Sequence, residues 1–158
     1  MRALIAAVTA LLLLGCSEPR PQPLNTINAL LRQSVNSRRD PALGERWLAS
    51  LTKRGSRDIV ELTDLRRRRP VPLPGLNRAD SLPIAVSVSA DGERLAVVEQ
   101  RGGRTELILY RRAQAALQRL PIDPPGVPRA VSLDARGRRL AVQVSRDGRW
   151  QVDLIQLP

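Results

Sequence analysis

The chain has 158 residues, enough for one ordinary domain, and its 26 Lys and Arg against 15 Asp and Glu leave a formal charge of +11. It contains no His, which excludes a Ser-His-Asp or Cys-His catalytic device, a His-ligated zinc site and an imidazole pH switch within a single chain. Two Trp, one Tyr and no Phe argue against an aromatic platform for stacking bases or sugars.

The first sixteen residues predict an export signal that ends at a lipid attachment site. Arg2 precedes an apolar run over residues 3–14, too short for the roughly 20 residues of a spanning helix but suited to a signal peptide. The run leads into the four residues Leu13, Leu14, Gly15 and Cys16. They resemble the bacterial lipobox, in which the cysteine thiol is acylated and the chain is cut just before it. The alternatives are a plain secretory peptide, in which the only cysteine of the chain is incidental, and a short membrane anchor.

The segment after the expected cleavage site predicts a lipid-bearing tether. Each acyl methylene buried in a bilayer contributes about 0.8 kcal/mol, so several chains on Cys16 hold a protein without a spanning helix. Ser17 follows the cysteine, and resemblance to other lipoproteins then implies the outer membrane over the inner one. Residues 17–24 hold three prolines and are expected to be extended. Residues 25–33 leave two interpretations open, a short helix capped by Asn25 or an extra strand on the domain edge. We therefore divide this region into residues 1–15, the signal peptide, and 16–36, the tether with a short N-terminal segment.

The rest of the chain repeats one pattern three times, over about residues 37–80, 81–126 and 127–158. In each copy a glycine precedes a Leu-Ala pair, which is followed by Arg, two turn residues, a second Arg and alternating apolar positions. The pairs begin at Leu48, Leu95 and Leu140. In this alignment Gly44 corresponds to Gly92 and Gly137, and Trp47 is an extra residue of the first copy.

Each copy predicts a set of antiparallel strands joined by tight turns. Alternating apolar residues suit half-buried strands, and two-residue Asp-Gly or Gly-Gly connections tolerate the positive φ of hairpin turns. One such turn joins a strand at residues 84–89 to a strand that begins at Arg94, and fourth strands are expected at residues 70–73 and 116–122. The residues assigned to turns are Asp91, Gly92, Gly102, Gly103, Gly137, Asp147 and Gly148.

Four-stranded units at this spacing predict an all-β fold of about three propeller-like blades, with the last blade incomplete. The third copy has only three expected strands. Its outer strand could come from residues near 24–35, from a second copy of the chain, or not exist.

One stretch resembles a known blade motif. Residues 89–97 read Ser-Ala-Asp-Gly-Glu-Arg-Leu-Ala-Val and resemble the Ser-Pro-Asp-Gly-Lys-x-Ile-Ala motif of TolB-like, or WD40-like, β-propellers. Residues 133–142 and 40–44 resemble it more loosely. The resemblance implies a partial propeller, in a short lipoprotein of the kind seen in cyanobacteria, and makes Asp91 a turn residue rather than an acid-base carboxylate. Ala90 replaces the motif proline, and there are three units where TolB propellers have six.

The sharpest charge feature is the run Arg66, Arg67, Arg68 and Arg69, expected between the third and fourth strands of the first copy. Arg presents a planar bidentate fork to phosphates and carboxylates, so the run could bind an anionic partner. The alternative is a solvated turn that discourages edge-to-edge aggregation.

These features predict a non-enzymatic, lipid-anchored, periplasm-facing envelope protein whose blades bind another protein or an acidic surface component. We expect no catalytic residues, no metal and no cofactor, and no nucleic acid partner, because export separates the chain from nucleic acid. The alternatives are a structural module in which a homodimer closes a six-bladed ring, and a basic module that binds anionic lipid or polysaccharide.

Overall fold

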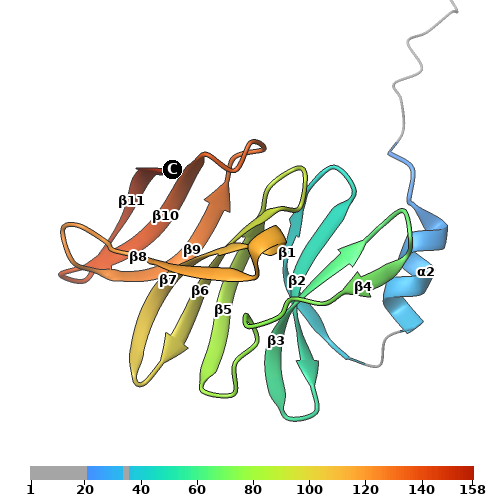
Figure 1. Cartoon of the computed structure of the whole chain (residues 1–158), viewed down its shortest axis with the longest axis horizontal. Helices are drawn as coiled ribbons and strands as arrows, with labels where there is room; N and C mark the ends of the chain where they lie inside the picture. The colour runs from blue at the N-terminus through green and yellow to red at the C-terminus, as the bar shows by residue number, and fades with distance from the viewer. Residues whose placement is uncertain (1–20, 34–35) are drawn as a thin grey trace, which may run out of the picture.

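A computed structural model describes residues 21–33 and 36–158 (Figure 1). The expected export signal, the lipobox residues Leu13, Leu14 and Gly15, and the expected lipidation site Cys16 lie outside the described residues. Helix α2 (Asn25–Gln33) is the first element of the described part, so this segment is a helix and not a strand. Over the described ranges, no helix is both long and apolar enough to cross a membrane.

The remaining chain forms three antiparallel sheets side by side (Figure 1). The first blade has the order β1 (Arg38–Leu43), β2 (Trp47–Arg54), β3 (Arg57–Asp64) and β4 (Arg69–Val71). The second has β5 (Ser81–Val88), β6 (Arg94–Arg101), β7 (Arg104–Arg111) and β8 (Ala116–Leu120), with the short helix η1 (Arg112–Gln114) before β8. The third has β9 (Val127–Leu133), β10 (Arg139–Arg146) and β11 (Arg149–Gln156). This confirms an all-β fold of three propeller-like blades with an incomplete last blade.

Turn chemistry explains where the strands reverse. In the β10–β11 hairpin, Asp147 and Gly148 both have positive φ, 49° and 74°, and Arg146 pairs with Arg149 across the turn. Two consecutive positive φ values define the turn whose twist matches that of paired strands, and Asp-Gly adopts it at low cost. The sequence therefore specifies this hairpin locally, before any packing between blades.

Equivalent backbone hydrogen bonds show how the three repeats align. One such bond recurs in each blade: Leu65 N–H to Arg46 O, Arg112 N–H to Glu93 O, and Leu157 N–H to Arg138 O. The next residue along, Trp47, therefore occupies the position of Arg94 and Arg139. Trp47 is thus not an extra residue, and the predicted alignment was wrong there.

The error in the alignment comes from a shorter loop in the first blade. The Gly44 N–H donates to Trp47 O, as the Ser89 N–H donates to Arg94 O and the Asp134 N–H to Arg139 O. Gly44 consequently matches Ser89 and Asp134, not Gly92 and Gly137. The loop of the first blade is two residues shorter than its counterparts. Gly44 therefore stands a few residues before the Leu-Ala pair, as Gly92 and Gly137 do, but it does not form the turn that they form.

Two apolar cores lie between neighbouring blades. In β6, Leu95 and Val97 pack toward the first blade, whereas Ala96 and Val98 pack toward the third. Side chains alternate across a strand, so each Leu-Ala pair sends Leu to the preceding blade and Ala to the following one. We call the side of a blade that meets the following blade its forward face, and the other side its rear face.

Polar bonds join the same blades at repeated spacing. The Val86 N–H donates to Asp40 Oδ2 at 2.5 Å, and the Leu133 N–H donates to Ser87 Oγ at 2.9 Å. At the loops, the Glu45 N–H donates to Ala90 O, and the Ala90 N–H donates in turn to Ala135 O. These bonds fix the angle between blades as well as satisfying backbone groups.

Trp47 closes the first interface at its loop end. The guanidinium groups of Arg46 and Arg112 lie over its ring, 4.8 and 4.4 Å from the ring centroid, in cation–π geometry. Gly92 has a φ of 72°, and a Cβ there would lie 2.5 Å from the Trp47 ring. Glycine at this turn is therefore required both by the backbone and by the neighbouring indole.

Candidate functional site

The forward face of the third blade is exposed although it is built like a buried one. Val60 and Leu62 of β3, and Leu107 and Leu109 of β7, are buried against the following blade. Their counterparts on β11 are 68% and 81% exposed, and Trp150 on the same face is 59% exposed. The forward face comprises Val127, Ala130, Ser132, Arg139, Ala141, Gln143, Ser145, Trp150, Val152, Leu154 and Gln156. No described residue packs over it, so it is the leading candidate for an interaction site.

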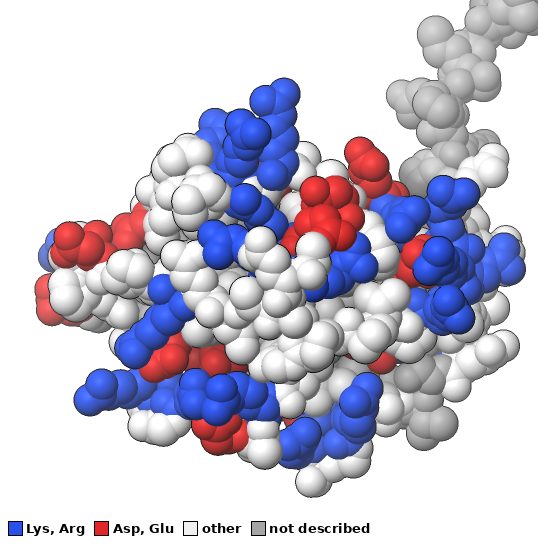
Figure 2. Space-filling view, viewed as in Figure 1, with Lys and Arg blue, Asp and Glu red and all other residues white. Residues whose placement is uncertain are grey.

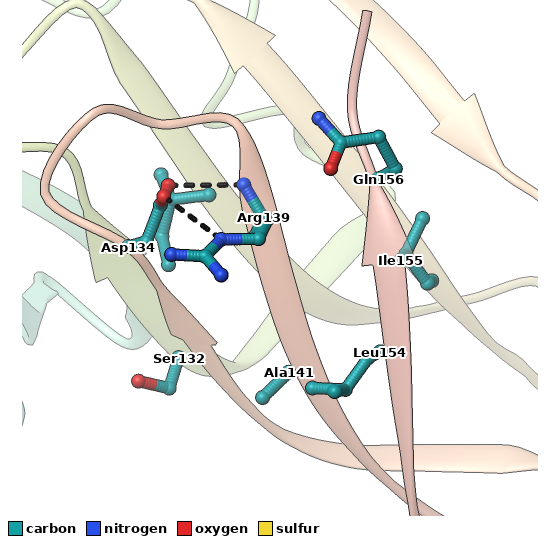
Figure 3. Close-up of a pocket in the computed structure, with 8 residues that line it drawn as sticks. Ser132, Asp134, Arg139, Ala141, Leu154, Ile155 and Gln156 are labelled. Carbon is teal, nitrogen blue, oxygen red and sulfur yellow. Dashed lines mark hydrogen bonds and ion pairs between the residues drawn. The ribbon is translucent and has the colours of Figure 1, made fainter.

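A hollow lies on the forward face beside β11. Ser132, Ala141 and Leu154 line a hollow of about 410 Å³, closed at one end by Asp134 and Arg139 (Figure 3). Leu154 pairs with Ala141 in the sheet register, and Ala141 pairs with Ser132. At this end of the face the large side chain therefore comes from β11, while the small ones come from β9 and β10.

The carboxylate at the end of the hollow is structural. Asp134 Oδ1 accepts the backbone N–H groups of Arg138 and Arg139 at 2.6 and 2.9 Å, and Oδ2 lies 3.5 Å from the Arg139 guanidinium (Figure 3). The backbone hydrogen bond from Arg139 is the main cause that holds the pKa of Asp134 below its usual value, against the opposite effect of burial. Asp134 is committed to its own loop, so it is not an acid-base candidate.

A partly buried ion pair joins β10 to β11. The Arg146 guanidinium binds Asp153 on β11 and donates to the carbonyl of Pro124 at 2.8 and 3.0 Å. The hydrogen bond that the Asp153 carboxylate accepts from Arg146 is the chief cause that lowers the pKa of Asp153. The outer edge of β11 carries no strand among the described residues.

The rear face of the first blade differs from the exposed forward face of the third blade. Ser50, Thr52 and Thr63 are buried there, and Arg38 binds both Ser50 and Glu61. Leu30 and Leu31 of α2 line a hollow with Glu61, Thr63, Arg68 and Pro70. Apart from the buried Ile59, one end of the arc is thus polar and has a helix beside it, whereas the other is largely apolar and open.

The arginine run forms the turn between β3 and β4, and Arg69 begins β4 itself. Asp64 Oδ1 accepts the backbone N–H groups of Arg66 and Arg67 at 2.9 and 3.1 Å. All four side chains of Arg66, Arg67, Arg68 and Arg69 are exposed. Figure 2 shows Lys and Arg on this side, beside α2 and β4, and along the lower edge where the β2–β3 and β6–β7 hairpins turn.

The other residues assigned to turns lie in turns. Asp91 Oδ1 accepts from the Ser89 hydroxyl at 2.5 Å and from the Glu93 N–H at 3.0 Å. Burial alone would raise the pKa of Asp91, but these hydrogen bonds outweigh it and hold the pKa below its usual value. The glycines with positive φ include Gly92, Gly102, Gly103, Gly137 and Gly148.

The described part of the chain offers no cluster of three metal-ligating side chains. Sequence reasoning did not single out Trp150, Val152 and Leu154. They carry the same alternating pattern as buried positions in the other blades, and a signal did exist, because an arc of three units, where TolB propellers have six, leaves the last unit without a following blade.

The comparisons with known proteins concern the fold. No family model matches the chain, and no curated protein is similar to it in sequence. TolB from Acinetobacter baumannii is similar in structure, with a TM-score of 0.59 and 16% identity over 75% of this chain and 29% of that TolB. The C-terminal WD40 domain of Sif2 has a TM-score of 0.46 at 15% identity, covering 74% of this chain and 32% of that one. The β-propeller domain of Myceliophteria thermophila Cps50 (Swd1) has a TM-score of 0.48 at 14% identity, covering 77% and 39%.

The fold is therefore that of a partial β-propeller similar to that of TolB. The chain spans less than a third of the length of the TolB structure that it matches.

Proposed function

We propose that this chain is a non-enzymatic envelope lipoprotein whose blades serve as a protein-binding scaffold. The observation that carries the proposal is the exposed apolar forward face of the third blade, whose counterparts are buried in the first and second blades. Exposed apolar patches of this kind mark interaction surfaces in soluble domains. The absence of His supports a binding role over a catalytic one.

The membrane part of the proposal rests on the lipobox pattern, residues 13–16. Acylated Cys16 would hold the propeller at the periplasmic side of the envelope, with Ser17 favouring the outer membrane, as in a short TolB-like lipoprotein of the cyanobacterial kind. The test is incorporation of a labelled fatty acid. Cys16→Ser should abolish both labelling and membrane attachment, and unchanged attachment would overturn the anchor.

The binding part is tested by capture from detergent-solubilised membranes. Leu154→Glu places a charge on the forward face and should lose the captured partners. Leu43→Glu is the matched control, because Leu43 is 72% exposed on β1 of the first blade. If both variants capture the same proteins as the unaltered chain, the forward face is not the binding surface.

A second candidate function, binding to an anionic surface, is favoured by the position of the arginine run. Arg68 lines the hollow beside α2, and α2 follows the expected tether. The nine Cα–Cα steps from Cys16 to Asn25 span at most about 30 Å when extended, so the run would lie near the lipid surface of an anchored chain. Each Arg close to an anionic surface contributes about 1 kcal/mol.

Vesicles that contain phosphatidylglycerol test this second function. Replacing Arg66, Arg67, Arg68 and Arg69 with Ser should weaken binding, most clearly at low salt. The control replaces four exposed cationic residues at the hairpin tips, Lys53, Arg54, Arg57 and Arg104, and should weaken binding less. Equal losses in the two variants would mean that net charge, and not the run, determines binding.

A further inference from the structure

The forward face of the third blade is shaped to receive a packed sheet. In the first two blades the corresponding side chains are covered by the following sheet, and Leu62 and Leu109 are completely buried. Sheets that pack face to face lie about 10 Å apart with interdigitating side chains. The partner of this face is therefore expected to present a sheet of complementary relief.

The same chain does not offer that sheet at its other end. Closing a ring head to tail would place the forward face against the rear face of the first blade. That rear face is polar, with Ser50 and Thr63 buried and Arg38 paired to Glu61, and α2 lies beside it. A six-bladed ring would require α2 to move and would pack apolar side chains on polar ones.

The forward face complements itself instead. At the end that holds the hollow of about 410 Å³, the large side chain Leu154 lies on β11 and the small side chains Ser132 and Ala141 lie on β9 and β10. A two-fold axis parallel to β10 would place β11 of each copy over β9 of the other. Val152 and Leu154 of one copy would then lie over Ala130 and Ser132 of its partner, in an isologous contact. Trp150 would lie over Val127.

Charge favours the same arrangement. The chain is 26% charged with a net charge of +11, so two copies repel each other over most of their surfaces. The charged side chains of the forward face lie at its margins: Arg139, in line with Ala141 on β10, is paired with Asp134, and Arg129 is exposed at the bulge of β9 beside Ala130. The uncharged centre between them is where two identical basic copies can approach most closely.

We propose that the third blade pairs face to face with the third blade of a second copy, forming a symmetric dimer in which each β11 fills the hollow of its partner. This inference rests on the proposed function, because it names the partner of the same forward face. It places the first blades and their tethers at the two outer ends of the dimer.

The experiment is sedimentation equilibrium of the full chain in a detergent matched in density to the buffer. A reversible dimer is expected, and raising the salt should not dissociate it, since screening reduces the repulsion between basic copies. Leu154→Glu and Ser132→Arg should each raise the dissociation constant of the dimer at least about tenfold. Leu43→Glu should leave it unchanged. Both substituted side chains of the face are exposed, so equal melting temperatures at low concentration will show that the variants fold.

Acrylamide quenching supplies an independent readout. Trp47 is buried, so quenchable emission comes from Trp150, and quenching should fall as the protein concentration rises. A monomer at every concentration, or a dimer that Leu154→Glu does not weaken, would overturn the proposal. If the chain is monomeric but Leu154→Glu still abolishes capture of a different protein, this inference fails and the proposed function stands. If neither dimer nor capture depends on Leu154, both fail.

Discussion

Leu109 and Leu154 occupy the same position in the second and third blades, yet Leu109 is completely buried and Leu154 is 81% exposed. Each lies opposite the alanine of the Leu-Ala sequence on the neighbouring strand of its own blade. Leu109 lies opposite Ala96, and Leu154 lies opposite Ala141. The difference is caused by the neighbouring sheet, since the third blade covers the forward face of the second. Burial here is a property of the arc and not of the repeat.

The two leucines should therefore respond differently to truncation. Leu109→Ala removes buried methyl groups and leaves a cavity, at a cost of about 2–5 kcal/mol in the free energy of unfolding. Leu154→Ala should change that free energy by less than about 0.5 kcal/mol in the monomer. Urea denaturation at low protein concentration measures both, and equal costs would show that Leu154 is covered within one copy.

Asp40 should stabilise the first interface between blades. It has a φ of 52° and accepts the Val86 N–H at 2.5 Å, so Asp40→Ala removes the acceptor and places an unfavourable residue in the left-handed region. We expect a loss of about 1–3 kcal/mol. Asp40→Asn keeps an acceptor oxygen and tolerates this φ, so its loss should be smaller. The control is Asp58→Ala, which breaks only the exposed pair with Arg39 and should cost less than about 1 kcal/mol.

Asp64 should make the first blade sensitive to acid. Backbone hydrogen bonding from Arg67 is the largest cause that lowers the pKa of Asp64 from its ordinary value of 3.8, opposed by burial and assisted by Arg46. A lowered folded-state pKa gives stability that is complete above the unfolded-state value and is lost as the pH falls through the folded-state value. Asp64→Asn keeps an acceptor but not the charge, so its melting temperature should fall less between about pH 5 and pH 2. If the melting temperatures of the unaltered chain and of Asp64→Asn fall equally over this pH range, Asp64 does not have this role.

Glu99 should have the opposite effect. It is buried on β6 directly opposite Glu106, and burial is the main cause that raises the pKa of Glu99 above its ordinary value of 4.5. A raised folded-state pKa means that the ionised form destabilises the fold at neutral pH and that stability is gained as the pH falls through that value. Glu99→Gln should raise the melting temperature at pH 7, with a smaller gain at pH 4. Replacing the exposed Glu45 with Gln should leave the melting temperature unchanged at both pH values. A lower melting temperature for Glu99→Gln at pH 7 would show that the Glu99 charge is well compensated in the fold.

The blade architecture could be predicted because its signals are local and repeated. Asp147 and Gly148 specify their hairpin with two residues, and alternating apolar positions mark the strands on either side. The alignment of the first repeat failed at Trp47, because a loop two residues shorter than its counterparts has no local signature. The role of Asp40 as a bond between blades was equally invisible, since its partner Val86 is distant in the sequence. The exposure of Leu154 depends on which sheet lies next to it, and no pattern within one repeat carries that information.

The most direct test of the central claim, that the forward face of the third blade is covered by a protein partner, is thiol accessibility in the membrane. Val152→Cys introduces a thiol on this face, and Leu43→Cys introduces one on the first blade. A membrane-impermeant maleimide should label the thiol at position 152 at least about tenfold more slowly in intact envelopes than in dilute detergent solution, while position 43 should react equally in both. Equal rates for the two positions in both settings would contradict the claim.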